Sequence, residues 1–262
     1  MKKRRYKYQK SIRIKRKKPL FKRSFFWPAI LAFVCLIGFS YFFFLSPFFQ
    51  IEEIKISGEN KVSRENIFSK IEDNLGKQIL FFKTKSVFLI NMAQMRGAIM
   101  DAFPQIGGVS FNRQLPGTLE IKIKERQAAA VWCSQQCYLI DETGFIFEEL
   151  AVDSEFLEIE HFEQPLEAGI GEKVIETDLL SLILNINIKL KKIEVPTIKA
   201  SAVSQERVNF KTQEGWEIYL NIKNDIDWQV EKLALVLEKE ISPQKRNNLE
   251  YIDLRFTRVY YK

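Results

Sequence analysis

The most prominent feature of the hydrophobic pattern is an uncharged run of 28 residues, from Ser24 to Ile51. Within it, Phe26 to Leu45 supplies the roughly 20 residues that a helix needs to cross about 30 Å of hydrocarbon. Aromatic residues crowd both ends of the run, where rings settle at a membrane interface. A cleaved signal peptide is the alternative, but the run is long for one and no Ala-x-Ala site follows it. The pattern therefore predicts an uncleaved transmembrane helix within residues 24–47.

The next stretch predicts a small domain of mixed helices and strands over residues 48–126. Apolar and polar residues alternate in 53–57 and 118–124, which is typical of half-buried strands, and 109–112 is a third short strand. Apolar positions spaced three and four apart predict helices over 63–76 and 88–103. The turn Leu115-Pro116-Gly117 joins the last two strands as a hairpin. The predicted order is strand, helix, helix, strand, strand.

Residues 127–262 predict a second, β-rich domain. Short strands are expected near 131–133, 137–140, 145–147, 200–203, 207–212, 216–221, 251–256 and 259–262, and helices over 173–191 and 226–237. Asn224 or Asp225 is positioned to cap the second helix. Residues 148–172 are rich in Asp and Glu and contain no Lys or Arg, so we expect a solvated connecting stretch there. The fold class is α+β.

Charge gives the expected orientation in the membrane. The formal net charge is +7, but residues 1–23 alone carry 13 Lys and Arg and no acidic residue. This asymmetry places a cytoplasmic tail before the helix and the bulk of the chain outside the cytoplasm, in the cytoplasmic (inner) membrane. We expect the tail to attract anionic lipid. Nucleic-acid binding is not expected, because no folded platform lies beneath the tail's aromatic residues.

Catalytic chemistry finds little support in the sequence. The chain has one histidine, His161, and lacks the nucleophile-elbow, P-loop, zinc-protease and dinucleotide-binding motifs. Zinc would need more nitrogen or sulfur ligands than the chain offers. We therefore expect no enzyme, no cofactor, no metal and no small-molecule substrate.

Two of the three cysteines, Cys133 and Cys137, flank a short turn. Their spacing is not the Cys-x-x-Cys of redox enzymes. Outside the cytoplasm, a structural disulfide between them and a pair of buried thiols are both consistent with the sequence. A closed loop this small would add little chain entropy to stability.

The order of these features resembles a known family. The segments "FFQIEEIKISGENKVS" and "PQIGGVSFNRQLPGTLEIKIKER", directly after a membrane anchor, resemble the two ends of a POTRA domain. The segments "KERQAAAVW" and "YLIDETGFIF", then "IDWQVEKLALVL" and "YIDLRFTRVYYK", resemble the β domain of the bacterial cell-division family FtsQ, called DivIB in Gram-positive bacteria. Ala128 departs from the family, whose members often have Pro there, and the turn at Thr257 is shorter than usual.

The resemblance implies a non-enzymatic scaffold of the division machinery that binds FtsB/FtsL-type membrane proteins during septum formation. It implies docking by β-strand addition at an exposed C-terminal edge strand. We expect no partner site beyond Lys262, and the expected partner-binding residues are Tyr251, Asp253, Arg255, Phe256, Arg258, Val259, Tyr260, Tyr261 and Lys262. One of the two adjacent tyrosines is expected to pack inward, and Asp253 and Arg255 either pair with each other or contact the partner. The alternative function is a POTRA-containing envelope protein for polypeptide transport or outer-membrane assembly.

Overall fold

A computed structural model describes residues 25–79, 82–134, 136–151, 154–161 and 168–262. It divides into two compact units, one made of residues 1–53, 76–90 and 114–118 and the other of residues 54–75, 91–113 and 119–262. The basic tail and its expected lipid contact lie outside the described residues.

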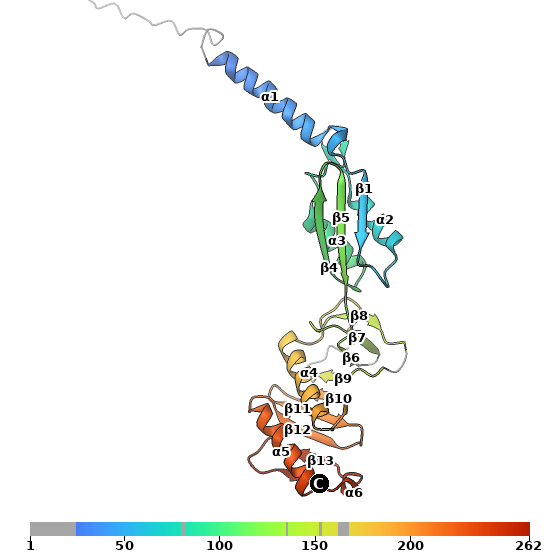
Figure 1. The fold of residues 1–262 in the computed structure, drawn as a ribbon, viewed down its shortest axis with the longest axis vertical. Coiled ribbons are helices and arrows are strands. Elements are labelled where there is room, and N and C mark those ends of the chain that lie inside the picture. Colours follow the sequence, from blue (N-terminus) through green and yellow to red (C-terminus); the bar gives the residue numbers. More distant parts are fainter. Residues whose placement is uncertain (1–24, 80–81, 135, 152–153, 162–167) are drawn as a thin grey trace, which may run out of the picture. The chain divides into compact units, whose positions relative to one another are not determined.

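The first unit contains the predicted membrane helix. Helix α1 (Phe26–Phe44) has 19 residues, none of them buried, and a mean hydropathy of 2.0 over its most apolar window (Figure 1). Within the described residues it is the one helix that is long and apolar enough to cross a membrane. A short 3-10 helix, η2 (Pro47–Phe49), follows it, and a small hairpin of β2 (Lys77–Ile79) and β3 (Phe82–Thr84) completes the unit. This hairpin was not expected from the sequence.

A three-stranded sheet with two helices matches the predicted strand–helix–helix–strand–strand order. Its strands run β1–β5–β4 in space, and α2 contacts α3. The bounds are β1 (Glu53–Ser57), α2 (Arg64–Asn74), α3 (Met92–Ala102), β4 (Ile106–Gln114) and β5 (Thr118–Glu125). The expectation that the second helix begins at 88 is wrong. It begins after Asn91, whose side-chain carbonyl accepts a hydrogen bond from the backbone N–H of Gln94 at 3.2 Å and so caps the helix.

The rest of the second unit is built on a nine-stranded mixed sheet. The spatial order is β14–β13–β12–β11–β10–β9–β6–β7–β8. The strands are β6 (Ala130–Cys133), β7 (Cys137–Ile140), β8 (Ile146–Glu149), β9 (Glu158–His161), β10 (Thr197–Ala202), β11 (Arg207–Thr212), β12 (Glu217–Asn221), β13 (Tyr251–Asp253) and β14 (Tyr260–Tyr261). Strand β9 pairs in parallel with both β6 and β10, and β12 pairs in parallel with β13. Residues 148–172 are therefore not a simple connecting stretch, because they contain the end of β8 and all of β9.

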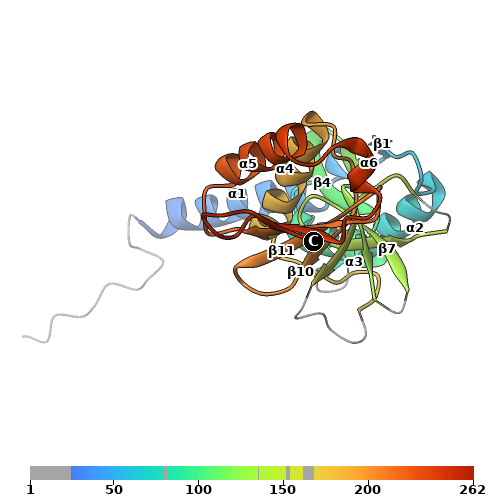
Figure 2. The ribbon, with the colours of Figure 1, turned by 90° about the horizontal axis from the view of Figure 1, so that it is seen from below.

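Two helices cover one face of this sheet. Helices α4 (Thr177–Lys192) and α5 (Ile226–Lys239) lie on the same side of the strands (Figure 2), and a four-residue helix, α6 (Pro243–Arg246), precedes β13. The helix-facing side chains of the sheet alternate with polar ones and are fully buried; they include Val208, Phe210, Ile218, Leu220 and Ile252. The opposite face carries the polar positions, which follows from the period of two along each strand.

The predicted turn at residues 141–144 joins β7 to β8. Gly144 has φ +82°, and a Cβ on it would lie 2.2 Å from the carbonyl oxygen of Ile175. Only glycine fits this turn without strain.

Candidate partner-binding edge

Strand β14 lies at one edge of the nine-stranded sheet. It pairs antiparallel with β13, with Tyr261 opposite Ile252 and Tyr260 opposite Asp253. Both of the last two strands are shorter than expected. Strand β13 ends at Asp253 rather than at residue 256, and β14 begins at Tyr260 rather than at residue 259; between them the chain leaves the sheet.

The register shows which backbone groups face the open side. Lys262 and Tyr251 exchange hydrogen bonds in both directions, at 3.2 and 3.4 Å. Directly opposed residues in an antiparallel pair alternate between hydrogen-bonded and non-hydrogen-bonded positions. Tyr261, the next residue, is therefore in a non-hydrogen-bonded position, and its N–H and C=O point away from β13. An incoming strand would meet these two groups first.

The aromatic side chains at this edge are exposed. Tyr260, Tyr261 and Phe256 are 53%, 47% and 55% exposed. The expectation that one tyrosine packs inward is wrong, because both rings stay about half exposed at the open edge of the sheet. The Tyr261 hydroxyl instead donates a hydrogen bond to Glu240 at 3.3 Å, and the Tyr260 ring meets Phe256 edge to face at 6.0 Å.

Asp253 and Arg255 pair with each other. The guanidinium donates to both carboxylate oxygens, from Nε at 2.9 Å and from Nη2 at 2.6 Å, and the backbone N–H of Arg255 adds a bond at 3.1 Å. Burial raises the pKa of Asp253, but these hydrogen bonds outweigh it and hold the pKa below its usual range. The same side-chain bond raises the pKa of Arg255. Because Arg255 is held by Asp253, its guanidinium has a fixed geometry just beyond the end of β13.

A second aromatic group adjoins this pair on the face without helices. The rings of Tyr219 and Tyr251 stack at 5.1 Å, and the guanidinium of Arg207 lies 4.3 Å from the Tyr219 ring centre. Burial, and after it Glu217, raises the pKa of the Tyr219 hydroxyl. Sequence reasoning missed Tyr219 and Arg207, because they reach this surface only through strand pairings that local sequence does not indicate: β12 pairs with β13, and β11 pairs with β12. The available sequence signal was that both residues occupy polar positions in segments where polar and apolar residues alternate.

A buried lysine holds the segment between β13 and β14. The Lys232 ammonium, from α5, donates to the carbonyls of Leu254 at 3.1 Å and Phe256 at 2.8 Å. Lys232 is 9% exposed, and burial lowers its pKa, with Asp253 opposing. These bonds satisfy two carbonyls that the irregular backbone would otherwise leave without strand partners.

The opposite edge of the sheet, β8, is covered by another part of the chain. The Ile146 N–H donates to the carbonyl of Glu172 at 2.8 Å, and the Ile146 carbonyl accepts from Gly171 at 3.0 Å. Glu148 pairs with Lys61 at 2.6 Å. Backbone cover and charge are two ways in which proteins block pairing at a sheet edge.

The remaining predicted residues have separate environments. Arg258 is exposed, Val259 packs partly against the core, and the ammonium of Lys262 lies 2.9 Å from a Glu250 oxygen. Cys133 and Cys137 lie directly opposite each other in the β6–β7 hairpin, and their sulfur atoms are bonded at 2.07 Å.

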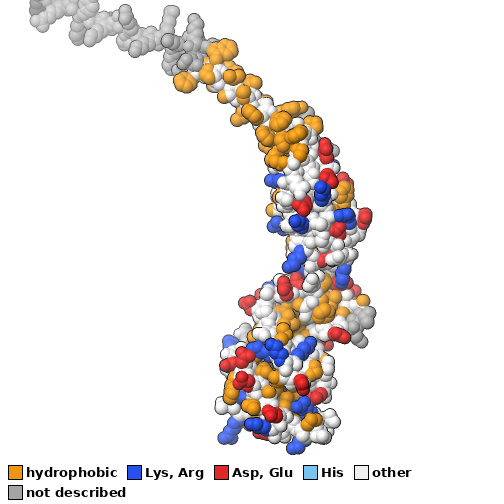
Figure 3. Space-filling model, in the orientation of Figure 1, with side chains coloured by type: hydrophobic (Ala, Val, Ile, Leu, Met, Phe, Trp, Pro, Cys, Tyr) orange, Lys and Arg blue, Asp and Glu red, His pale blue; other side chains and the backbone are white. Residues whose placement is uncertain are grey.

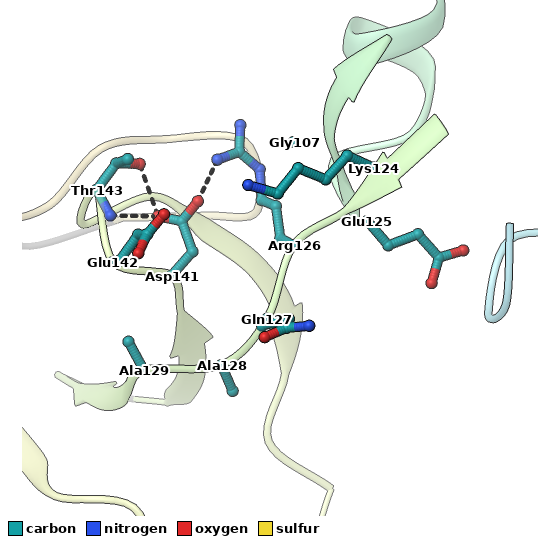
Figure 4. A pocket seen from close by; sticks show the side chains of 10 residues that line it. All are labelled: Gly107, Lys124, Glu125, Arg126, Gln127, Ala128, Ala129, Asp141, Glu142 and Thr143. Atoms are coloured by element: carbon teal, nitrogen blue, oxygen red, sulfur yellow. Dashed lines mark hydrogen bonds and ion pairs between the residues drawn. The ribbon is translucent and has the colours of Figure 1, made fainter. Parts of the chain in front are cut away.

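A hollow of about 360 Å³ beside the β7–β8 turn contains the most buried ion pair of the second unit (Figure 4). Arg126 points to Asp141, and their side chains are 11% and 8% exposed. Asp141 also accepts hydrogen bonds from the hydroxyl and N–H of Thr143 and from the N–H of Phe145. Burial raises the pKa of Asp141, but these bonds outweigh it and the pKa lies below its usual range. A carboxylate with this many donors is a poor general base.

Within the part of the chain that the structure describes, no group of three or more His, Cys, Asp or Glu side chains is arranged to hold a metal ion. His161 is the last residue of β9.

Comparison with known proteins matches the two regions of the chain that follow α1. The model of the POTRA domain, FtsQ-type, matches residues 49–126, and the model of the cell division protein FtsQ/DivIB C-terminal region matches residues 130–255. Together they cover more than three quarters of the chain.

Several curated proteins are similar to the chain, some over most of its length and some over little more than a third of it. "Cell division protein DivIB" of Clostridium acetobutylicum is 26% identical over 216 residues, which are 80% of this chain and 81% of that protein. "Cell division protein FtsQ" of Geotalea daltonii is 26% identical over 227 residues, 81% of this chain and 74% of that protein. "Cell division protein FtsQ" of Rickettsia bellii is 30% identical over 98 residues, 37% of this chain and 33% of that protein.

Proposed function

Because this chain belongs to the FtsQ/DivIB family of cell-division proteins, we propose that it is a non-catalytic scaffold that docks FtsB/FtsL-type membrane proteins at strand β14. Membership of this family implies a role in the division machinery and interaction with other proteins of that machinery. Helix α1 and the family membership fit a single-pass protein of the inner membrane. The strand that carries the docking, and the identity of the partners, are the parts that we propose.

The orientation that we propose puts residues 1–23 in the cytoplasm and both folded domains outside it. It rests on the 13 Lys and Arg that precede α1. The same residues make anionic lipid the expected contact of the tail.

The observation that carries the proposal is the difference between the two edges of the nine-stranded sheet. At β8, both outward groups of Ile146 bond to residues 171 and 172, whereas at β14 the N–H and C=O of Tyr261 point outward. An incoming strand that pairs with β14 would continue the sheet and gain backbone hydrogen bonds.

Side chains around β14 would then select the partner. Tyr260 and Phe256 offer an exposed aromatic pair, and aromatic side chains are enriched at binding hot spots. The Asp253–Arg255 pair lies on the same face as Tyr260, because Asp253 is directly opposite it in the register. Arg255 is partly exposed and offers a charged contact while it stays bonded to Asp253.

The decisive experiment separates the backbone of Tyr261 from its side chain. Tyr261→Pro removes the outward N–H and places a ring in the path of an incoming strand, and Pro is tolerated on an edge strand when its nitrogen faces outward. Tyr261→Ala removes the side chain and keeps the N–H. The assay is capture of an FtsB/FtsL-type complex by the full-length chain in detergent.

We expect Tyr261→Pro to weaken capture by at least about tenfold, which corresponds to about 1.4 kcal/mol, and Tyr261→Ala to weaken it less. Unchanged thermal unfolding shows that both variants are folded. If a folded Tyr261→Pro variant captures the partner as well as the parent does, strand addition at β14 is excluded.

A further inference from the structure

The end of α1 is joined to a distant part of the chain by side-chain hydrogen bonds. The Ser86 hydroxyl donates to the carbonyl of Phe43 at 3.0 Å, and the Thr84 hydroxyl donates to the carbonyl of Phe44 at 2.6 Å. The last carbonyls of a helix have no partner within the helix, and hydrocarbon offers them none. Residues that follow α1 by about 40 positions therefore cap it.

The short segment that follows α1 makes further hydrogen bonds to the same distant part of the chain. The Gln50 side-chain carbonyl accepts from the N–H of Lys85 at 2.6 Å, and its amide donates to Thr84 at 3.1 Å. The backbone adds two bonds, from Val87 to Phe49 at 3.0 Å and from Ile51 to Lys85 at 3.1 Å. The helix thus continues into a hydrogen-bonded block and not into a free linker.

An aromatic cluster surrounds this block. It consists of Phe42, Phe43, Phe48, Phe49 and Phe88, with neighbouring ring centres 5.0–6.4 Å apart. Only Phe49 is buried, whereas Phe48 is 59% and Phe42 47% exposed. Apolar side chains continue without interruption from α1 onto this end of the unit (Figure 3).

The length of α1 indicates where these rings lie relative to the membrane. Nineteen helical residues at 1.5 Å each span about 28 Å, close to the thickness of the hydrocarbon layer. The cluster begins in the last turn of the helix and continues for one 3-10 turn beyond it. It therefore falls at the boundary between hydrocarbon and headgroups, where aromatic rings settle, Trp and Tyr more strongly than Phe.

We propose that the aromatic cluster is a second membrane contact: it lies in the headgroup region of the leaflet at the C-terminal end of α1, and the Thr84 and Ser86 caps fix it there. The partner is the lipid surface. The inference rests on the membrane-spanning helix and on these contacts, and it does not depend on docking at β14.

Spin labels on the full-length chain in phosphatidylethanolamine/phosphatidylglycerol vesicles test the depth of the cluster. Three chains are compared: the parent labelled at Cys35 inside α1, and Cys35→Ala chains labelled at Phe48→Cys or at Phe256→Cys. Cys133 and Cys137 are bonded to each other and do not take up the label. Phe48 and Phe256 are exposed to a similar extent, 59% and 55%, so a difference between them reports on lipid.

We expect a nickel complex in the water to collide with the label at 48 several-fold less often than with the label at 256, and oxygen to collide with it more often. Equal nickel accessibility at 48 and 256 would overturn the membrane contact.

A second comparison tests the caps. Thr84→Val with Ser86→Ala removes both hydroxyls, and we expect nickel collisions at 48 to rise toward the value at 256. Thr84→Ser, which keeps its hydroxyl, should leave them unchanged, as should Ser110→Ala, which removes a hydroxyl elsewhere. Unchanged accessibility in the double variant would show that the caps do not hold the cluster in place.

Discussion

The ion pair between Arg126 and Asp141 allows a quantitative test of what stabilises the second unit. The perturbation is Arg126→Ala. It removes a charge-assisted bond to Asp141, the 3.1 Å bond from Nε to the carbonyl of Pro104, and the packing of the guanidinium 4.0 Å above the Phe145 ring. Because both side chains are nearly buried, the change leaves a carboxylate with little access to water.

Removing one partner of a buried ion pair typically costs 3–5 kcal/mol. Asp141 keeps three other donors, from Thr143 and Phe145, so we expect the lower end, about 3 kcal/mol. For a unit of this size, about 2–4 °C per kcal/mol gives a midpoint lowered by roughly 6–12 °C. The assay is thermal unfolding of the full-length chain in detergent, followed by tryptophan fluorescence, since Trp132 and Trp216 are buried.

The matched control is Lys61→Ala. The Lys61–Glu148 pair has a similar separation, 2.6 Å, but its side chains are 62% and 34% exposed, so its loss should cost no more than about 1 kcal/mol. The pH dependence supplies a further check. The depressed pKa of Asp141 stabilises the fold above its unfolded pKa of about 4, and this stabilisation is lost as the pH falls through the folded pKa. The loss of stability caused by Arg126→Ala should therefore become smaller below about pH 4. Equal effects of the two substitutions at pH 7 would refute the role of burial in this reasoning.

Three further outcomes are expected from the same unfolding assay. Lys232→Met should lower stability by about 1–3 kcal/mol, because two carbonyls before β14 lose their donor, and it should weaken partner capture; a stable variant with normal capture contradicts that role. Asp253→Asn should cost about 1–2 kcal/mol at pH 7, and the difference should shrink as the pH falls below about 4 and through the lowered folded pKa of Asp253; a difference in stability that does not change with pH would contradict this stabilising role of the carboxylate. Replacing Cys133 and Cys137 by Ala should cost no more than about 2 kcal/mol, because so short a loop adds less chain entropy than a long one, and reduction of the parent should reproduce the loss.

Local periodicity was enough to predict the elements that have one buried face. The helix at 226–237 was predicted from apolar residues spaced four, three and four apart, and Asp225 caps it by accepting from the N–H of Trp228. The strand 207–212 agrees in both bounds with β11, since Val208 and Phe210 alternate with polar neighbours. The POTRA domain and the FtsQ/DivIB family were likewise recognised correctly from the order of the elements.

The missed elements lack this local signal. In strand β9, Ile159 is buried between two partly exposed glutamates, and the strand is held by parallel partners that are distant in sequence. Arg126 and Asp141 are paired through the meeting of two elements, and neither residue's neighbours indicate it. The partner-binding residues at β14 stay a prediction, although the open edge on which they depend lies where the sequence suggested.

Strand β9 also sets how the large sheet can come apart. It has four residues, and in the sheet order it alone joins the β6–β8 meander to strands β10–β14. Its hydrogen bonds close over long stretches of chain, so they form late and open first compared with the hairpins on either side. Loss of these few bonds would leave the β6–β8 meander and the β10–β14 group, each with its own strand pairing, so the amide protons of β9 and its two neighbours should exchange together.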